Sequence, residues 1–195
     1  MEASFSSFID YIQQIVPLTD EEVTLLLSKV KLRNYLKNQY IVQKGDVCFT
    51  TNFIISGCTK TFYRDIEGNE HVFLFSEENW WTSDLGSFVS QTPADFDVCC
   101  LEDTNVVQIN YHDLQDLYAS IPKLESLFRI IVERAYIATQ KRLIQNFSLP
   151  AKERYLIFAS NYPSIVNRVP QYLIASYLGI TKQFLSKIKK ELVQE

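Results

Sequence analysis

The stretch between Pro122 and Asn146 constrains the fold more than any other part of the chain. No glycine or proline interrupts it, and Pro150 closes it. Proline is tolerated in the first turn of a helix, so Pro122 can begin one. About 25 residues at about 1.5 Å each span about 37 Å, which is more than a small domain needs. The sequence therefore predicts one long helix from about residue 122 to residue 146.

Apolar residues surround much of this predicted helix. Leu124, Phe128, Ile131, Ala135 and Ala138 follow one another at intervals of four and three, the heptad spacing of paired helices. Further apolar residues widen this surface, and they are Leu127, Ile130, Val132 and Ile137. One side of the helix can then face the rest of the chain and the other a partner helix. We predict a homodimer through the long helix; a wholly intramolecular core helix is the alternative.

Short β-rich runs with glycines between them precede the helix. The segment Asp65–Asn69 joins two of these runs as a hairpin, with Gly68 in a left-handed turn position. Many short strands at such spacing are typical of a β-sandwich or a jelly-roll-like barrel. The expected strands are 40–43, 53–56, 58–65, 70–75, 97–100 and 105–109. We therefore predict an α+β fold with an N-terminal double-stranded β-helix, a jelly-roll-like β-roll.

Further helices are expected on both sides of the β-roll. Thr19 and Glu22 have the spacing of a capping box, ahead of an apolar helical pattern that runs from Val23 to Val30. A short helix is expected at 113–118 and another at 151–161, with a loop around Pro163. A final pair of helices completes the chain.

Composition narrows the class of protein. The chain has 195 residues, 47% apolar and 22% charged, which is ordinary for a soluble globular protein. No apolar run approaches the roughly 20 residues of a membrane span, and the first ten residues lack the features of a secretory signal. Four cysteines are too few for a disulfide scaffold. We expect a cytoplasmic protein that does not contact a membrane.

The charge of the chain is unevenly distributed. A net charge of −4 and a pI near 5.3 argue at first against a nucleic-acid binder. Residues 1–140 hold 10 Lys+Arg and 20 Asp+Glu, a net of −10. Residues 141–195 hold 9 Lys+Arg and 3 Asp+Glu, a net of +6. An acidic body with a basic C-terminal part indicates two domains with different partners, although one dipolar domain fits the same numbers.

The most specific pattern lies between Gln171 and Lys190. Pro170 favours a helix start, Gly179 permits a tight bend, and Thr181 can cap a second helix. The residues expected to face inward are Ile174, Ala175, Leu178, Leu185 and Ile188. A small residue, a glycine four positions later and apolar residues at these offsets form the pattern of a helix-turn-helix.

The outer face of the second helix carries long polar side chains of the kinds that contact phosphates or read guanine and adenine edges. They are Lys182, Gln183, Ser186, Lys187 and Lys190. An ordinary helical hairpin with a solvated lysine face is the alternative interpretation. Together with the local charge of +6, the pattern predicts DNA binding.

Two segments resemble the CRP/FNR family of bacterial transcription regulators. FIISGCTKTFYRDIEGNEHVFLF (53–75) is similar to the central hairpins of that family's cyclic-nucleotide-binding β-roll, and RVPQYLIASYLGITKQFLSKIKKEL (168–192) resembles its Bacteroidetes-type branch. The order of β-roll, long helix and helix-turn-helix is also the family's. The resemblance implies a sensor domain at 1–113, a dimerisation helix at 114–147 and a DNA-binding domain at 148–195.

The resemblance also implies roles for individual residues. The family's base-reading positions correspond to Lys182, Gln183 and Lys187, and Gln171 matches a region that contacts the DNA backbone. The expected DNA-binding set is Gln171, Thr181, Lys182, Gln183, Ser186, Lys187 and Lys190. A dimer would place two recognition helices about 34 Å apart on palindromic double-stranded DNA. RNA polymerase is a further partner that the resemblance allows.

The chain departs from the cyclic-AMP-binding members of the family in one cassette. Those members hold Gly-Glu for the ribose and Arg-Ser for the cyclic phosphate. Counted without gaps, these pairs fall on Ser83-Asp84 and Ala94-Asp95. The cation that would pair with the phosphate is therefore missing, and a carboxylate takes the neighbouring place. We expect no tight binding of cyclic AMP, and the effector is either unknown or absent. The candidate pocket residues are Arg64, His71, Trp81, Asp84, Leu85 and Asp95.

The sequence offers little for catalysis or metal binding. Cys99 and Cys100 are adjacent, so on a strand they point to opposite faces, and His71 and His112 are far apart. No nucleophile elbow, phosphate loop or metal-binding helix motif is present. We predict no catalytic residue, metal or cofactor, and four buried structural thiols. The main alternative function is a ligand-binding β-roll sensor whose helical tail docks on a protein; a jelly-roll enzyme is a third.

Overall fold

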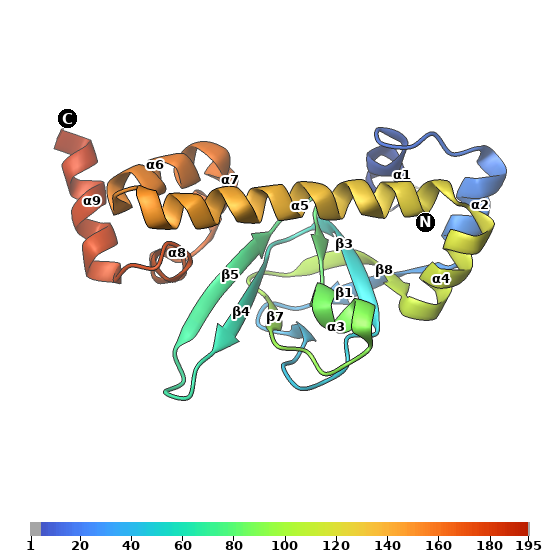
Figure 1. The fold of residues 1–195 in the computed structure, drawn as a ribbon, viewed down its shortest axis with the longest axis horizontal. Coiled ribbons are helices and arrows are strands. Elements are labelled where there is room, and N and C mark those ends of the chain that lie inside the picture. Colours follow the sequence, from blue (N-terminus) through green and yellow to red (C-terminus); the bar gives the residue numbers. More distant parts are fainter. Residues whose placement is uncertain (1–4, 195) are drawn as a thin grey trace. The chain divides into compact units, whose positions relative to one another are not determined.

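The computed structural model describes residues 5–194 (Figure 1). Within these residues the chain divides into two compact units. The first combines the chain up to residue 61 with residues 75–134, and the second combines residues 62–74 with the chain from residue 135 onward. The boundary in the C-terminal half therefore falls inside the long helix. No helix in residues 5–194 is both long and apolar enough to cross a bilayer.

Two four-stranded sheets form a β-roll. The first has the order β1-β8-β3-β6, with β1 at Val30–Tyr35, β8 at Thr104–Asn110, β3 at Thr50–Ser56 and β6 at Trp81–Thr82. The second has the order β2-β7-β4-β5, with β2 at Tyr40–Val42, β7 at Asp97–Cys100, β4 at Thr59–Arg64 and β5 at Glu70–Ser76. The six expected strands are all present, with ends shifted by a few residues. The fold is a mixed α+β fold with a β-roll.

Strand β1 corrects the expected end of the capped helix. The helix is α2 (Asp20–Ser28), and its capping box is confirmed because Thr19 Oγ1 accepts from Glu22 N while Glu22 Oε2 accepts from Thr19 N. Val30, which was expected to continue the helix, instead begins β1 and pairs with Ile109 of β8. The β-branched side chain of Val30 fits both patterns, and pairing with a distant strand decides between them.

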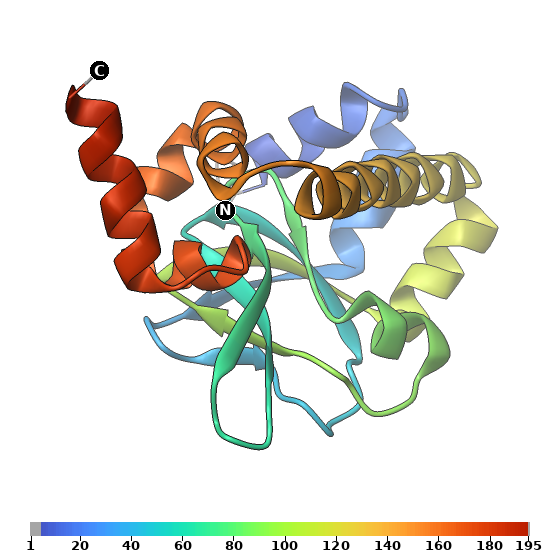
Figure 2. The same ribbon diagram turned by 60° about the vertical axis from the view of Figure 1, so that its left-hand side comes forward.

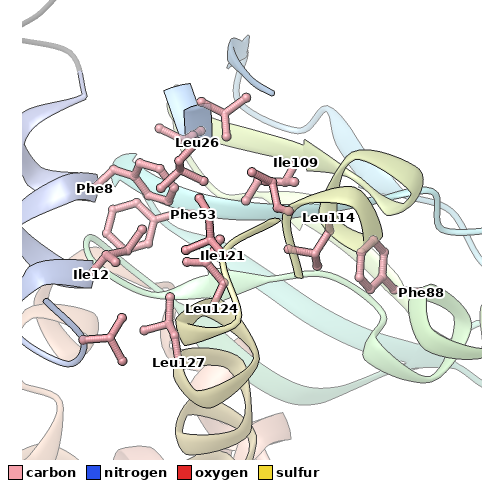
Figure 3. Packing of buried hydrophobic residues seen from close by; sticks show 14 of the residues in the cluster. Phe8, Ile12, Leu26, Phe53, Phe88, Ile109, Leu114, Ile121, Leu124 and Leu127 are labelled. Atoms are coloured by element: carbon pink, nitrogen blue, oxygen red, sulfur yellow. The ribbon is translucent and has the colours of Figure 1, made fainter. Parts of the chain in front are cut away.

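The core of the first unit lies between the β-roll and helices from both ends of that unit (Figure 3). Phe8 and Ile12 come from α1 (Ser6–Gln13), a helix that the sequence did not predict, and they pack beside Phe53 of β3. Helix α4 (Tyr111–Ser120) adds buried leucines, and the first turns of the long helix add Leu124 and Leu127. Each fully buried side chain of this size contributes about 2 kcal/mol.

The long helix is confirmed as α5 (Lys123–Ser148), one continuous helix of 26 residues (Figure 1). Its first turns pack within the chain: Leu124 is buried, and Phe128 and Ile131 pack partly buried against the core. Ala135 and Ala138 are exposed. The predicted heptad positions therefore begin on an intramolecular face. The exposed large apolar residues of α5 are Val132, Tyr136, Ile137, Leu143, Ile144 and Phe147.

Among the described residues, the second unit has four helices after α5. They are α6 (Ala151–Asn161), α7 (Pro163–Arg168), α8 (Gln171–Tyr177) and α9 (Lys182–Gln194). Figure 2 shows the last two in red, joined by a tight turn. The loop expected around Pro163 is wrong: Pro163 begins α7, where a proline is favoured because its missing N–H is not needed. The same unit contains the outer part of the β4–β5 hairpin.

Candidate nucleic-acid interface

The turn between α8 and α9 has the geometry that its sequence predicts. Gly179 has a φ of +65°, a left-handed conformation that favours glycine. The Gly179 and Ile180 amides donate to the carbonyls of Ser176 and Ala175, at 3.0 Å each. These two hydrogen bonds close α8 in a Schellman motif. Open space surrounds the position of a Cβ on Gly179, so the glycine serves the backbone angle and not a close contact.

The start of α9 is capped by Thr181, whose Oγ1 accepts from the Phe184 amide at 3.1 Å. Two residues of α9, Leu185 and Ile188, are almost fully buried. On α8 the buried residues are Leu173, Ile174 and Ala175, followed by Leu178 at the turn. The expected inner faces are therefore confirmed. Because both faces are anchored by apolar packing, the rotation of α9 about its own axis is fixed.

The predicted DNA-binding residues lie on the outside of this helix pair. Gln183, Lys187 and Lys190 are exposed and follow the i, i+4, i+7 spacing of one helix face. Lys182 and Thr181 are exposed beside them, and Ser186 is half-buried. Gln171 is exposed at the first position of α8. The structure thus places six of the seven predicted residues on the capped start and outer side of α9, and Gln171 on α8.

Sequence reasoning missed three further residues near this surface. Glu191 Oε1 lies 4.0 Å from Lys187 Nζ, one turn further along α9. Phe184 and Tyr172 are large apolar or aromatic side chains that are exposed on α9 and α8. Neither aromatic side chain belongs to the polar types that indicate DNA contact, and the spacing of the apolar residues on α8 and α9 is the only signal that places them outside the buried faces.

Some basic residues of the C-terminal part serve the fold instead. Arg154 of α6 donates to the Leu178 carbonyl at 2.9 Å and to Asn146 Oδ1 at 3.1 Å, so it holds the end of α8. The Arg142 guanidinium lies over the rings of Phe73 and Tyr177, at 5.2 and 4.5 Å from their centroids, and donates to the Phe73 carbonyl. The positive charge available to a partner is therefore concentrated in the lysines.

Strand β5 of the β4–β5 hairpin packs against α8 within the second unit. Ser176 Oγ donates to the Glu70 carbonyl at 2.6 Å and accepts from the Val72 amide at 3.0 Å. One hydroxyl group thus satisfies two backbone groups of β5, as a neighbouring strand would. Together with the stacking of Arg142, this fixes α8 against the hairpin.

A second polar cluster surrounds Asp84, which caps α3 (Leu85–Ser90). Its side chain accepts from three backbone amides: Ser87 N at 2.9 Å, Asp95 N at 2.9 Å and Phe96 N at 3.0 Å. Asp84 is only 5% exposed. Both carboxylate oxygens are therefore engaged inside the protein. The structure brings Asp84 and the backbone of Asp95 together, whereas the Asp95 side chain and Leu85 are exposed.

The remaining candidate pocket residues do not share this cluster. Trp81 packs in an aromatic group with Phe8, Phe53 and Phe128, with ring centroids 4.8–6.0 Å away. Arg64 and His71 belong to the hairpin in the other unit, are well exposed, and pair with carboxylates of that hairpin at 3.2 and 2.7 Å. A pocket of about 180 Å³ is lined by residues 40–43 and 46–50, and none of the six candidate pocket residues is among them. It is small compared with the roughly 300–1,000 Å³ of ligand pockets.

The four cysteines are buried. Burial raises the pKa of the Cys100 thiol to about 11 and also raises the pKa of Cys48. The predicted burial of the thiols is confirmed. In residues 5–194, no three His, Cys, Asp or Glu side chains gather where they could hold a metal ion.

Comparison with known proteins connects the β-roll to a domain family. Residues 32–120 match the family model of the cyclic nucleotide-binding domain. This stretch of the chain is therefore a cyclic-nucleotide-binding-type β-roll, as the resemblance implied. No curated protein matches the chain in sequence.

Solved regulators share the fold over most of the chain. CLP of Xanthomonas campestris, described as a c-di-GMP responsive global regulator, has a TM-score of 0.72 at 15% identity and covers 90% of this chain and 92% of its own. FixK2 from Bradyrhizobium japonicum has a TM-score of 0.71 at 13% identity, covering 85% of each chain. The Thermus thermophilus catabolite activator protein has a TM-score of 0.54 at 17% identity, covering 94% and 87%. The similarity to CRP/FNR-type regulators is thus confirmed for the fold.

Proposed function

We propose that this chain is a sequence-specific DNA-binding transcription regulator of the CRP/FNR type. The observation that carries the proposal is the outer surface of α9, where Gln183, Lys187 and Lys190 stand exposed on one face while Leu185 and Ile188 anchor the other. A helix of this kind fits the major groove, and its amide and ammonium groups are donors that match base edges and phosphates. The pair α8–α9 is then a helix-turn-helix with α9 as the recognition helix.

Charge supports the same surface. The part of the chain that contains α8 and α9 carries a net charge of +6, whereas the preceding 140 residues carry −10. Three of its arginines have partners inside the fold, including Arg168, which donates to Ser164 Oγ at 3.1 Å. The exposed lysines on α9 therefore dominate the attraction for phosphate. Binding should weaken steeply as salt rises, because each neutralised phosphate releases counterions.

The exposed apolar side of α5 supports a homodimer. Tyr136, Leu143 and Phe147 are spaced seven and four residues apart, and all are exposed in the single chain. A soluble helix rarely leaves so many large apolar side chains in water unless a partner covers them. A second copy covers the same face by two-fold symmetry, and this symmetry matches a palindromic site. We therefore assign the dimer contact to this face of α5 and not to the heptad positions that the sequence predicted.

The Asp84 cluster supports a regulator that does not respond to cyclic AMP. In cyclic-AMP-binding relatives, the segment that aligns with 83–95 holds the ribose and phosphate. Here, the Asp84 carboxylate is already bound by the backbone amides of Ser87, Asp95 and Phe96. An internal anion therefore occupies amides that an external anion would need, and it would repel a phosphate. Calorimetric titration with cyclic AMP is expected to give no heat of binding; micromolar binding would contradict this part of the proposal.

The proposal is tested by selecting a binding site from random-sequence double-stranded DNA with the full chain. The expected result is a palindromic motif whose half-sites lie one helical turn, about 34 Å, apart. Lys187→Ala should then weaken binding by about 1–3 kcal/mol and relax the preference at one position, if Lys187 reads a base. An equal loss on all sequences would make Lys187 a phosphate contact. Lys31→Ala, which removes an exposed lysine of β1, is the matched control and should leave binding unchanged.

The alternative is a ligand-binding β-roll sensor whose C-terminal helices dock on a protein. The exposed aromatic residues Tyr172 and Phe184 on α8 and α9 are what favours it. A selection that enriches no sequence, with DNA affinity independent of sequence, would support this alternative. Contact with RNA polymerase and membership of the Bacteroidetes-type branch stay predictions.

A further inference from the structure

Phe184 is an exposed apolar side chain in the first turn of α9, beside the polar outer face of that helix. It is 46% exposed, although a phenylalanine of a small helical domain is normally packed in its core. It lies three residues before Lys187, so these two side chains are neighbours on the helix surface. Lys187 is in turn a neighbour of Gln183, four residues before it. The exposed phenyl ring therefore lies at the edge of the group of residues proposed to face DNA.

The structure fixes Phe184 in this outward position. Thr181 Oγ1 accepts from the Phe184 amide at 3.1 Å, which places Phe184 in the first turn of α9. The next residue, Leu185, is fully buried, and Ile188 is 2% exposed. Turning Phe184 inward would rotate these two residues out of the core of the helix pair. Its exposure is thus a consequence of the packing and not of a loose helix end.

We propose that Phe184 reads a thymine in the binding site by apolar contact with the C5-methyl group of that base. This inference rests on the proposed function. The thymine methyl is the apolar group that the major groove presents, and phenylalanine is one of the side chains that contact it. The N-terminal residues of a recognition helix are those that reach base edges, and Phe184 is the third residue of α9. Lys187, one turn further along α9, and Gln183 supply polar contacts to neighbouring bases.

The expected discrimination follows from the size of one methyl group. Loss of one methyl group that is buried at an interface weakens binding about fourfold. The effect should appear at one thymine position of each half-site and should not depend on salt, because no charge is involved. Phosphate contacts by lysine, in contrast, change with salt and not with the methyl group.

The test uses the full chain and the palindromic duplex that it selects. Each thymine in turn is replaced by deoxyuridine, which removes only the C5-methyl group and keeps base pairing. We expect the wild-type chain to bind about fourfold more weakly when one particular thymine is replaced. Phe184→Ala should lose affinity for the thymine duplex and bind the thymine and deoxyuridine forms equally. Phe184→Leu keeps an apolar contact and should retain part of the discrimination.

Controls separate this inference from the proposed function. Leu156→Ala removes an exposed apolar side chain of α6 with a similar exposure and should keep the wild-type discrimination. Thermal unfolding of each variant shows whether it is folded. A selection that yields no site overturns the proposed function. In the other case a site is selected, Lys187→Ala weakens binding to it, and wild type and Phe184→Ala respond identically to every deoxyuridine replacement. That result overturns the role of Phe184 alone and leaves its ring to contact a protein partner.

Discussion

Replacing Asp84 by alanine should cost the fold several kcal/mol. The Asp84 side chain is 5% exposed and accepts from the amides of Ser87, Asp95 and Phe96 at 2.9–3.0 Å. With alanine at position 84, these three amides would lose their buried hydrogen-bond acceptor. Loss of the cap of α3 costs about 1 kcal/mol, and each of the two other unsatisfied amides costs about 1–2 kcal/mol or more. The expected loss in the free energy of unfolding is about 3–5 kcal/mol.

The assay is chemical denaturation of the full chain, followed by tryptophan fluorescence and circular dichroism. Asp95→Ala is the matched control because the Asp95 side chain is exposed and only its backbone amide meets Asp84. It should change the free energy of unfolding by no more than about 0.5 kcal/mol. Asp84→Asn keeps one acceptor oxygen, so its loss in the free energy of unfolding should lie between those of Asp84→Ala and Asp95→Ala. If Asp84→Ala costs less than about 1 kcal/mol, the carboxylate does not hold the segment together, and the reasoning about an internal anion fails.

Three further predictions concern other parts of the chain. Leu143→Glu, on the exposed face of α5, should shift sedimentation from dimer to monomer because it would bury a charge at the interface; an unchanged mass would place the interface elsewhere. Cys100 is buried and has a pKa of about 11, so it should resist alkylation at pH 8 in the native protein and react only after unfolding; rapid native labelling would disprove its burial. Hydrogen bonds from His71 and from the Asn69 amide lower the pKa of Asp65 from 3.8 to about 2. The folded value lies below the unfolded one, so this contribution to stability is present above about pH 4 and is lost as the pH falls toward 2; a carboxyl ¹³C titration with a midpoint at the ordinary value would contradict it.

Features that depend on neighbouring residues could be predicted from the sequence. The Asp65–Asn69 turn forms as expected, with Gly68 at a φ of +87°, and Gly179 adopts its left-handed angle between α8 and α9. The capping box of Thr19 is present because its two hydrogen bonds join residues three positions apart. The outer and inner faces of α9 follow directly from the helical period, so the outward position of the candidate DNA-binding residues could be predicted as well.

Features that depend on distant partners were missed. Val30 looked like the end of a helix because its strand exists only through pairing with β8. Helix α1 has little to mark it in the sequence, and its Phe8 and Ile12 are explained by the core that they meet. The exposed face of α5 could not be told from its buried face, because both are apolar and only the core selects between them.

The Asp84 cluster lies between these two cases. The spacing of Asp84 and Ser87 is that of an ordinary helix cap, which a local rule can find. The return of the amides of Asp95 and Phe96 to the same carboxylate depends on the loop after α3, and no local pattern indicates it. The resemblance places Asp84 and Asp95 in one cassette and implies that the Asp84 carboxylate contacts a ligand. In the structure this carboxylate accepts from backbone amides instead.

The central claim is that α9 reads DNA sequence, and a fluorescence anisotropy titration tests it most directly. The full chain is titrated against the selected palindromic duplex and against the same duplex with scrambled half-sites, at two salt concentrations. We predict at least about a thousandfold preference for the palindrome and an affinity that falls steeply with salt. Equal affinity for both duplexes, or no binding to either at low salt, would contradict it.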